Sequence, residues 1–184
     1  MSHGFELEPA KGPAVPDQVA LAGFSLMLDR FNGLLLKLSM AALIVTSLIL
    51  TYSVASRYFF KVPTDWQDEA SVFMLVGVTF FCCAYVQSYR GHIGIEALSS
   101  LLSPRVNAVR QLIVDVVSLA FCAFFSWKSW AMCHEAWVEG MTTSSTLAPP
   151  LWIPYAMMAA GMSILTLQIL VQVLTHITNN RSFR

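Results

Sequence analysis

Three acidic residues stand directly ahead of a long apolar run in the segment TDWQDEASVFMLVGVTFF, residues 64–81. Asp65 and Asp68 precede the run, and Glu69 begins to enter it. An uncharged run of this kind suits the inside of a membrane, where an ionised carboxylate is costly and is usually paired or functional. We therefore expect Glu69 to have a cationic partner.

Two cations are candidates for that partner. Arg57 ends the preceding apolar run, and Lys128 lies 18 residues beyond Arg110, which is about 27 Å further along a helix. Either pair would link neighbouring helices, and the alternative is that these charges contact a partner protein. Lys128 can instead extend its ammonium to the lipid headgroups.

Helix capping explains part of the acidic cluster. The N-terminus of a helix favours negative charge, because its first N–H groups are unpaired and its dipole is positive there. Thr64 with Gln67 also matches the capping box, and Pro63 ends the segment before it. We therefore expect a helix that starts at this corner.

The other reactive side chains favour no catalytic site. The cysteines form no C-x-x-C pair, and the histidines fall near the ends of apolar runs or in the N-terminal tail, away from where a haem would need them. These residues are Cys82, Cys83, Cys122, Cys133, His3, His92, His134 and His176. A four-helix membrane redox protein, using thiols and quinone or haem, is the alternative function. A stand-alone exporter would have only Asp115 as its intramembrane carboxylate.

Hydropathy predicts the elements that position these residues. Of 184 residues, 56% are hydrophobic and 12% are charged, whereas a soluble domain has about 25% charged residues. Crossing a bilayer core about 30 Å thick takes roughly 20 helical residues. The sequence predicts an all-α integral membrane protein with one membrane domain, 38–175, whose transmembrane helices lie at about 38–58, 66–89, 111–138 and 151–174. Residues 1–37 and 176–184 form the terminal segments.

The distribution of Lys and Arg predicts the orientation. Cytoplasmic loops near membrane spans carry the excess of these residues. The two termini and the second loop hold eight of them, namely Lys11, Arg30, Lys37, Arg90, Arg105, Arg110, Arg181 and Arg184. The opposite side has Arg57 and Lys61, so both termini are expected in the cytoplasm. The tryptophans are expected together at the outer interface: Trp66, Trp127, Trp130, Trp137 and Trp152.

Two shorter segments have helical patterns. Val19 to Phe31 is apolar, and it either lies along the inner membrane surface or extends the first transmembrane helix. The segment YRGHIGIEALSSLLSPR, residues 89–105, predicts a short amphipathic helix between the second and third spans. Its apolar residues can share one helical face: Ile95, Leu98, Leu101 and Leu102. His92, at its start, is more typical of a turn or cap than of a ligand.

Several motifs follow one another in a distinctive order: SRYFFKVPTDWQDEASVFMLVGVTFF, then RGHIGIEALSSLL, then LAPPLWIPYAMMAAGMSIL. Across about residues 34–174 this order resembles the small membrane subunit of TRAP transporters, the DctQ family. Its most specific positions are Arg57, Tyr58, Trp66, Glu69, Gly77, His92, Ile93 and Pro154. Relatives often have a proline ahead of the glycine in the fourth span, where this chain has Ala159 and Ala160 before Gly161.

The resemblance implies a scaffold in a three-part secondary transporter of a bacterial inner membrane. A large membrane subunit would carry the substrate and sodium sites, and a periplasmic binding protein would deliver an organic anion, a carboxylate or a sulfonate. The small subunit would contact these two proteins and membrane lipids, enlarge the static frame of an elevator-like transporter, and bind no nucleic acid, cofactor, metal or substrate itself. The Pro63–Glu69 corner and the loop at 138–151 would then face the binding protein.

Overall fold

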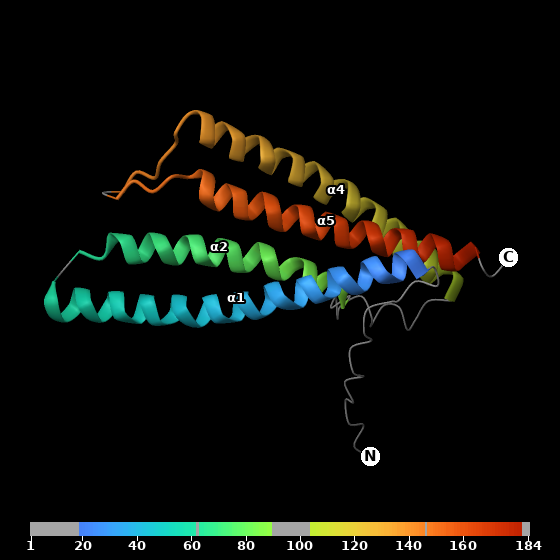
Figure 1. The fold of residues 1–184 in the computed structure, drawn as a ribbon, viewed down its shortest axis with the longest axis horizontal. Helices are drawn as coiled ribbons and strands as arrows, with labels where there is room; N and C mark the ends of the chain where they lie inside the picture. Colours follow the sequence, from blue (N-terminus) through green and yellow to red (C-terminus); the bar gives the residue numbers. More distant parts are fainter. Residues whose placement is uncertain (1–18, 62, 90–103, 146, 182–184) are drawn as a thin grey trace, which may run out of the picture.

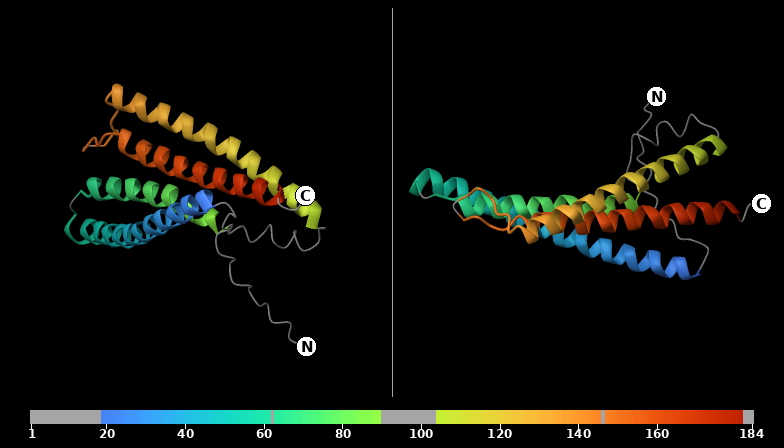
Figure 2. Two further views of the ribbon diagram at one scale, coloured as in Figure 1. Left: turned by 45° about the vertical axis from the view of Figure 1, so that its right-hand side comes forward. Right: turned by 90° about the horizontal axis from the view of Figure 1, so that it is seen from above.

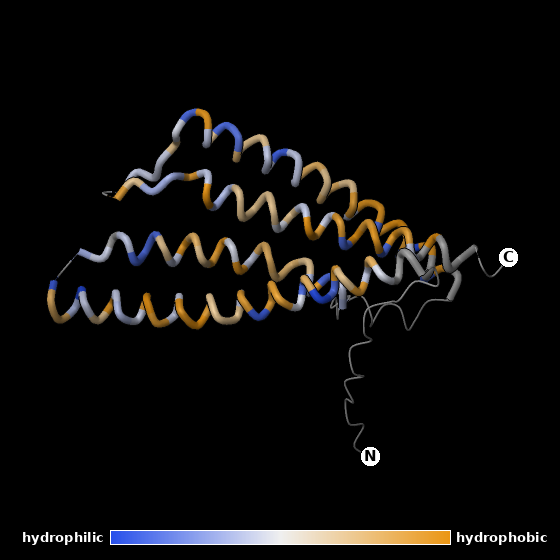
Figure 3. Tube along the Cα trace, viewed as in Figure 1, coloured by the Kyte–Doolittle hydropathy of each residue, from blue (hydrophilic) through white to orange (hydrophobic). Residues whose placement is uncertain are grey.

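A computed structural model describes residues 19–61, 63–89, 104–145 and 147–181. These residues form four helices, α1 (Val19–Phe60), α2 (Asp65–Ser88), α4 (Pro104–Val138) and α5 (Trp152–Arg181). Each helix contains a stretch long and apolar enough to cross a membrane, and Figure 3 shows apolar residues along most of each one. The predicted all-α fold with four membrane-spanning helices is therefore confirmed.

The helices lie side by side in one layer, in the order α1, α2, α5, α4 (Figure 1). The α1–α2 turn and the α4–α5 loop lie together at one end, which we call the loop end; the other is the terminal end. Because both α2 and α5 start at the loop end, these central neighbours run in parallel. Figure 2 shows that α1 and α4 leave the layer on opposite sides of α5 toward the terminal end.

The first helix is longer than predicted. Its 42 residues form one continuous element, about 63 Å long. Residues 19–37 extend the first transmembrane helix, so the alternative of a separate surface helix is wrong. The amphipathic helix predicted after the second span, with His92, lies at 90–103, outside the described residues.

Buried hydroxyl and amide side chains line α1 at every seventh position: Ser25, Asn32, Ser39, Thr46 and Ser53. A seven-residue repeat keeps one narrow stripe of a helix against its neighbour, as in a left-handed coiled coil. Small polar residues on that stripe allow close approach and hydrogen bonding inside a membrane. This repeat was readable in the sequence, but a search for uncharged runs does not detect it.

The two central helices approach each other closely at Gly161. A Cβ atom on Gly161 would lie 2.6 Å from the Phe80 Cβ and 2.8 Å from the Phe80 carbonyl carbon and oxygen. A Cβ on Gly77 would meet only the Met157 sulfur, at 3.1 Å. The backbone of α5 therefore packs directly on α2 at Gly161, and only glycine fits there.

Hydrogen bonds set the register between α4 and α5. The Ser126 and Ser163 hydroxyls are 2.9 Å apart, and the Trp130 indole nitrogen donates to the Ser163 oxygen at 3.0 Å. Ser163 is the twelfth residue of the 24-residue apolar stretch Trp152–Thr175, which places these contacts halfway along it. At the loop end, the rings of Trp137 and Trp152 meet edge to face, 4.9 Å apart.

This register corrects the predicted tryptophan belt. Trp137 and Trp152 lie together at the loop end, and Trp66 lies in the first turn of α2 at that same end. Trp130 bonds to the middle of α5 instead, and Trp127 is one turn or less from it along α4. The prediction that all five tryptophans lie at one interface is therefore wrong for Trp127 and Trp130.

Candidate functional site at the loop end

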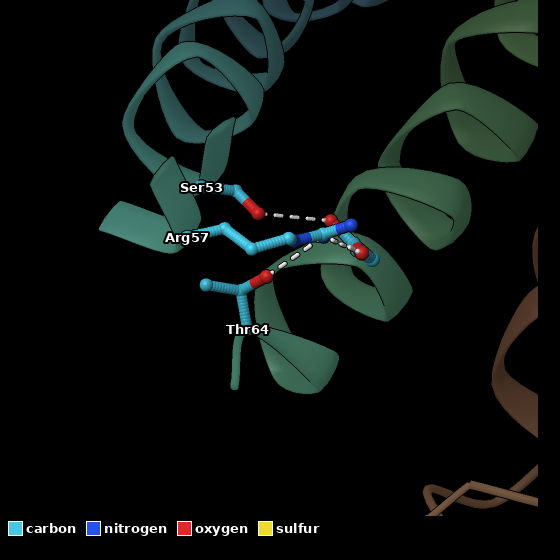
Figure 4. Close-up of polar contacts among 4 residues, drawn as sticks. Ser53, Arg57 and Thr64 are labelled. Atoms are coloured by element: carbon cyan, nitrogen blue, oxygen red, sulfur yellow. Dashed lines mark hydrogen bonds and ion pairs between the residues drawn. The ribbon is translucent and has the colours of Figure 1, made fainter. Parts of the chain in front are cut away.

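A polar network joins α1 to the start of α2 (Figure 4). One Arg57 nitrogen, Nη2, donates to the Asp68 Oδ2 and to the Thr64 hydroxyl, each at 2.8 Å. The Ser53 hydroxyl donates to the other Asp68 oxygen at 3.1 Å. The side chains of the ion pair are 60% and 48% exposed, so the pair contributes about 1 kcal/mol or less.

Two expectations for this corner are wrong. Arg57 pairs with Asp68, one residue before the expected Glu69. The capping box is not formed, because Thr64 makes no side-chain cap and its hydroxyl accepts the bond from Arg57. The backbone alone starts the helix, with the Gln67 and Asp68 N–H groups donating to the Thr64 carbonyl at 3.2 and 3.3 Å.

Glu69 bonds to the α4–α5 loop. Its Oε1 accepts a hydrogen bond from the Thr143 hydroxyl at 2.6 Å, while its buried Oε2 has no hydrogen-bond partner. Among the described side chains, no Lys or Arg lies within ion-pair distance of this carboxylate. The expected cationic partner is therefore replaced by a hydroxyl from a loop 74 residues away.

The loop bonded to Glu69 is a compact hairpin. The Thr143 N–H donates to the Pro149 carbonyl at 3.0 Å, and the Leu151 N–H donates to the Met141 carbonyl at 2.9 Å. Gly140 takes a φ of +63°, a conformation that suits glycine at the end of a helix. Glu69 therefore holds an ordered loop against α2, and the two predicted partner-contact segments form one surface.

We expect Thr143→Val to lower the stability of the chain by about 1–3 kcal/mol, because Glu69 Oε1 would lose its hydrogen-bond donor while its buried Oε2 already has none. Thr142→Val is the matched control, since that exposed neighbour pairs with Pro150 through its backbone. Thermal unfolding in detergent and amide exchange across residues 139–151 would measure the difference. Equal melting temperatures for the two variants would contradict the role of the Glu69 contact.

The remaining predicted site residues do not join this network. Trp66 is 53% exposed on the first turn of α2. The Asp65 side chain and all of His92 lie outside the described part of the chain. Lys128 is exposed on α4, with its ammonium 5.0 Å from the centre of the Trp127 ring.

A second cluster of polar side chains, which sequence reasoning missed, lies toward the terminal end. The Asn32 amide donates to the Gln168 Oε1 at 3.0 Å. The Gln87 amide donates to the Gln172 Oε1 at 2.9 Å, and the Gln172 amide donates back to the Gln87 carbonyl at 2.8 Å. We call these four residues the amide cluster. Its sequence signal is a pair of glutamines four residues apart inside an apolar run.

The cysteines are free thiols in the described structure. Cys122 packs with Met162, Ile169 and Val173 between α4 and α5. The Cys83 thiol donates to the Thr79 carbonyl of its own helix at 3.1 Å. Within the described ranges, no group of His, Cys, Asp and Glu side chains is placed to hold a metal ion.

Comparisons with known proteins agree with the resemblance noted in the sequence. The family model for the DctQ component of tripartite ATP-independent periplasmic transporters matches residues 46–179. The C4-dicarboxylate TRAP transporter small permease protein DctQ of Vibrio cholerae serotype O1 (strain ATCC 39315 / El Tor Inaba N16961) is 27% identical over 155 residues. That alignment covers 69% of this chain and 66% of the relative, slightly less than two thirds of the relative's length.

Proposed function

Because the chain belongs to the DctQ family of tripartite ATP-independent periplasmic transporters, we propose that it is the scaffold subunit of a secondary transporter for an organic anion. The observation that carries the proposal is the family match, which spans all of α2 and α4 and most of α5. A large membrane subunit would hold the substrate and sodium sites. A periplasmic binding protein would deliver the substrate.

The open layer supports a scaffold role. Within an 18-residue apolar window of α1, α2 and α4, only 11–17% of residues are buried by the rest of the chain, against 44% in α5. Such a layer leaves wide apolar faces that lipids and a second membrane protein can cover. The described helices contact mainly their neighbours in the row, and α1 meets α5 at a few positions, so they form an open layer rather than a closed bundle.

The proposed orientation places the loop end in the periplasm. In the sequence, Lys and Arg are concentrated in the two terminal segments and the second loop, and short cytoplasmic loops carry such an excess. The Pro63–Glu69 corner and the Thr143 hairpin then face the binding protein as one surface. Asp68 is engaged with Arg57, so the exposed hairpin offers the freer part of this surface.

The named relative supports a C4-dicarboxylate as the first substrate to test. Purified small and large subunits in liposomes, supplied with the cognate binding protein and a sodium gradient, are expected to take up radiolabelled succinate. Omitting this chain is expected to abolish the uptake. Equal uptake without it, or uptake by this chain alone, would contradict the proposed function. Failure with succinate but success with a sulfonate would change only the substrate.

A further inference from the structure

Lys128 lies on the face of α4 that points away from α5. The buried side of α4 repeats every seventh residue, at Asp115, Cys122, Ser129 and Ala136. Val117, Phe121 and Phe124 lie on the opposite side and are 62%, 64% and 55% exposed. Lys128 falls in line with them by helical spacing and is also exposed. We call these four residues, together with Trp127, the Lys128 face.

The register with α5 places the Lys128 backbone close to the middle of the apolar stretch of α5. Ser126 is level with Ser163, halfway along the apolar stretch of α5. Lys128 is two residues further on, about 3 Å toward the loop end. The sequence had placed Lys128 near the outer membrane face, by counting from Arg110. The contacts of Ser126 and Trp130 with Ser163 place it nearer the middle of the layer, and α4 continues for ten residues beyond it, to Val138, as predicted.

The described chain offers Lys128 no counter-charge. Among the described side chains, no Asp or Glu is shown within ion-pair distance of Lys128, and its ammonium contacts the Trp127 ring. Extension to the headgroups is also unfavourable. The membrane surface nearer to Lys128 is the one at the loop end. The Cα–Cβ bonds of a helix tilt toward its N-terminus, which for α4 is at the terminal end, so the Lys128 side chain starts in the direction away from that surface.

We infer that the Lys128 face is where the large transporter subunit docks, with a carboxylate on that subunit pairing with the Lys128 ammonium; this inference rests on the proposed function. Charged side chains at such depth usually face protein or water and pair with opposite charge. Lipid tails carry no group that can accept a hydrogen bond from the ammonium. The aromatic side chains of Phe121, Phe124 and Trp127 around it are typical of the buried centre of a protein interface.

Photocrosslinking of the intact complex tests where the large subunit docks. A benzophenone amino acid at Phe124 is expected to crosslink to the large subunit. The matched control is the same probe at Ile44, which is 63% exposed on α1, at the opposite edge of the layer. Crosslinking from Ile44 with none from Phe124 would overturn the inference.

Substitution of Lys128 tests the ion pair itself. Lys128→Met is expected to reduce the large subunit retained on the affinity-tagged small subunit at least tenfold, and Lys128→Arg is expected to retain it. The isolated Lys128→Met chain should melt no lower than the original, because the change removes a charge facing lipid. Full retention by Lys128→Met would overturn the inference.

The two experiments separate this inference from the proposed function. If the unmodified chain retains the large subunit while Phe124 gives no crosslink and Lys128→Met changes nothing, docking is elsewhere and the scaffold role stands. If the unmodified chain carries no large subunit in any membrane preparation, both are wrong.

Discussion

Replacement of Gly161 by alanine is expected to destabilise the chain by about 3 kcal/mol or more. The added Cβ would lie within 2.8 Å of the Phe80 backbone, and backbone cannot rotate aside as a flexible side chain can. Helices α2 and α5 would have to separate at the centre of the layer. For a chain of this size, the melting temperature in detergent should fall by roughly 6–12 °C.

Two other glycines provide matched controls for Gly161→Ala. The Cβ added by Gly33→Ala has nothing within 4 Å, so this change should be neutral or should stabilise α1 by up to about 1 kcal/mol. Gly77→Ala meets the movable end of Met157 and should have a small effect. If all three variants melt at the same temperature, the close α2–α5 contact does not exist in the membrane protein.

The second large effect is expected for Gln172→Leu in the amide cluster. This change removes two hydrogen bonds to Gln87, one to its side chain and one to its carbonyl. Hydrogen bonds between membrane helices contribute about 0.6 kcal/mol on average and up to about 1.7 kcal/mol, so we expect a loss of about 1–3 kcal/mol. Thermal unfolding in detergent measures this loss.

Thr79→Val is the control for Gln172→Leu. It also replaces a polar residue inside a membrane-spanning helix, but the Thr79 hydroxyl bonds only to the Leu75 carbonyl of its own helix. Its melting temperature should be almost unchanged. A loss of stability as large as that of Gln172→Leu would mean that any polar side chain at such a depth stabilises the chain, whether or not it links two helices.

The number of membrane-spanning helices was readable from hydropathy, because each needs about 20 apolar residues whatever its neighbours are. The order of the helices was not, because an apolar surface carries little information about which helix covers it. That order decides the pairing of the acidic residues. Asp68 and Glu69 are about 100° apart around α2, so Asp68 reaches α1 and Glu69 reaches the loop before α5.

The depth of Lys128 in the membrane-spanning layer could not be predicted from the sequence either. Counting residues from Arg110 assumes that α4 enters the membrane at that arginine. The bonds from Ser126 and Trp130 to Ser163 fix its depth against another helix and move Lys128 toward the middle of the layer. Side-chain register between helices is a property of packing, and a single-helix pattern does not contain it.

The most direct test of the scaffold role is affinity purification of this chain from its native membrane in mild detergent, with identification of the proteins that accompany it. We expect one large protein with many membrane-spanning segments, in fixed stoichiometry. Recovery of the chain alone, folded and able to transport an organic anion or bind a redox cofactor by itself, would contradict the account.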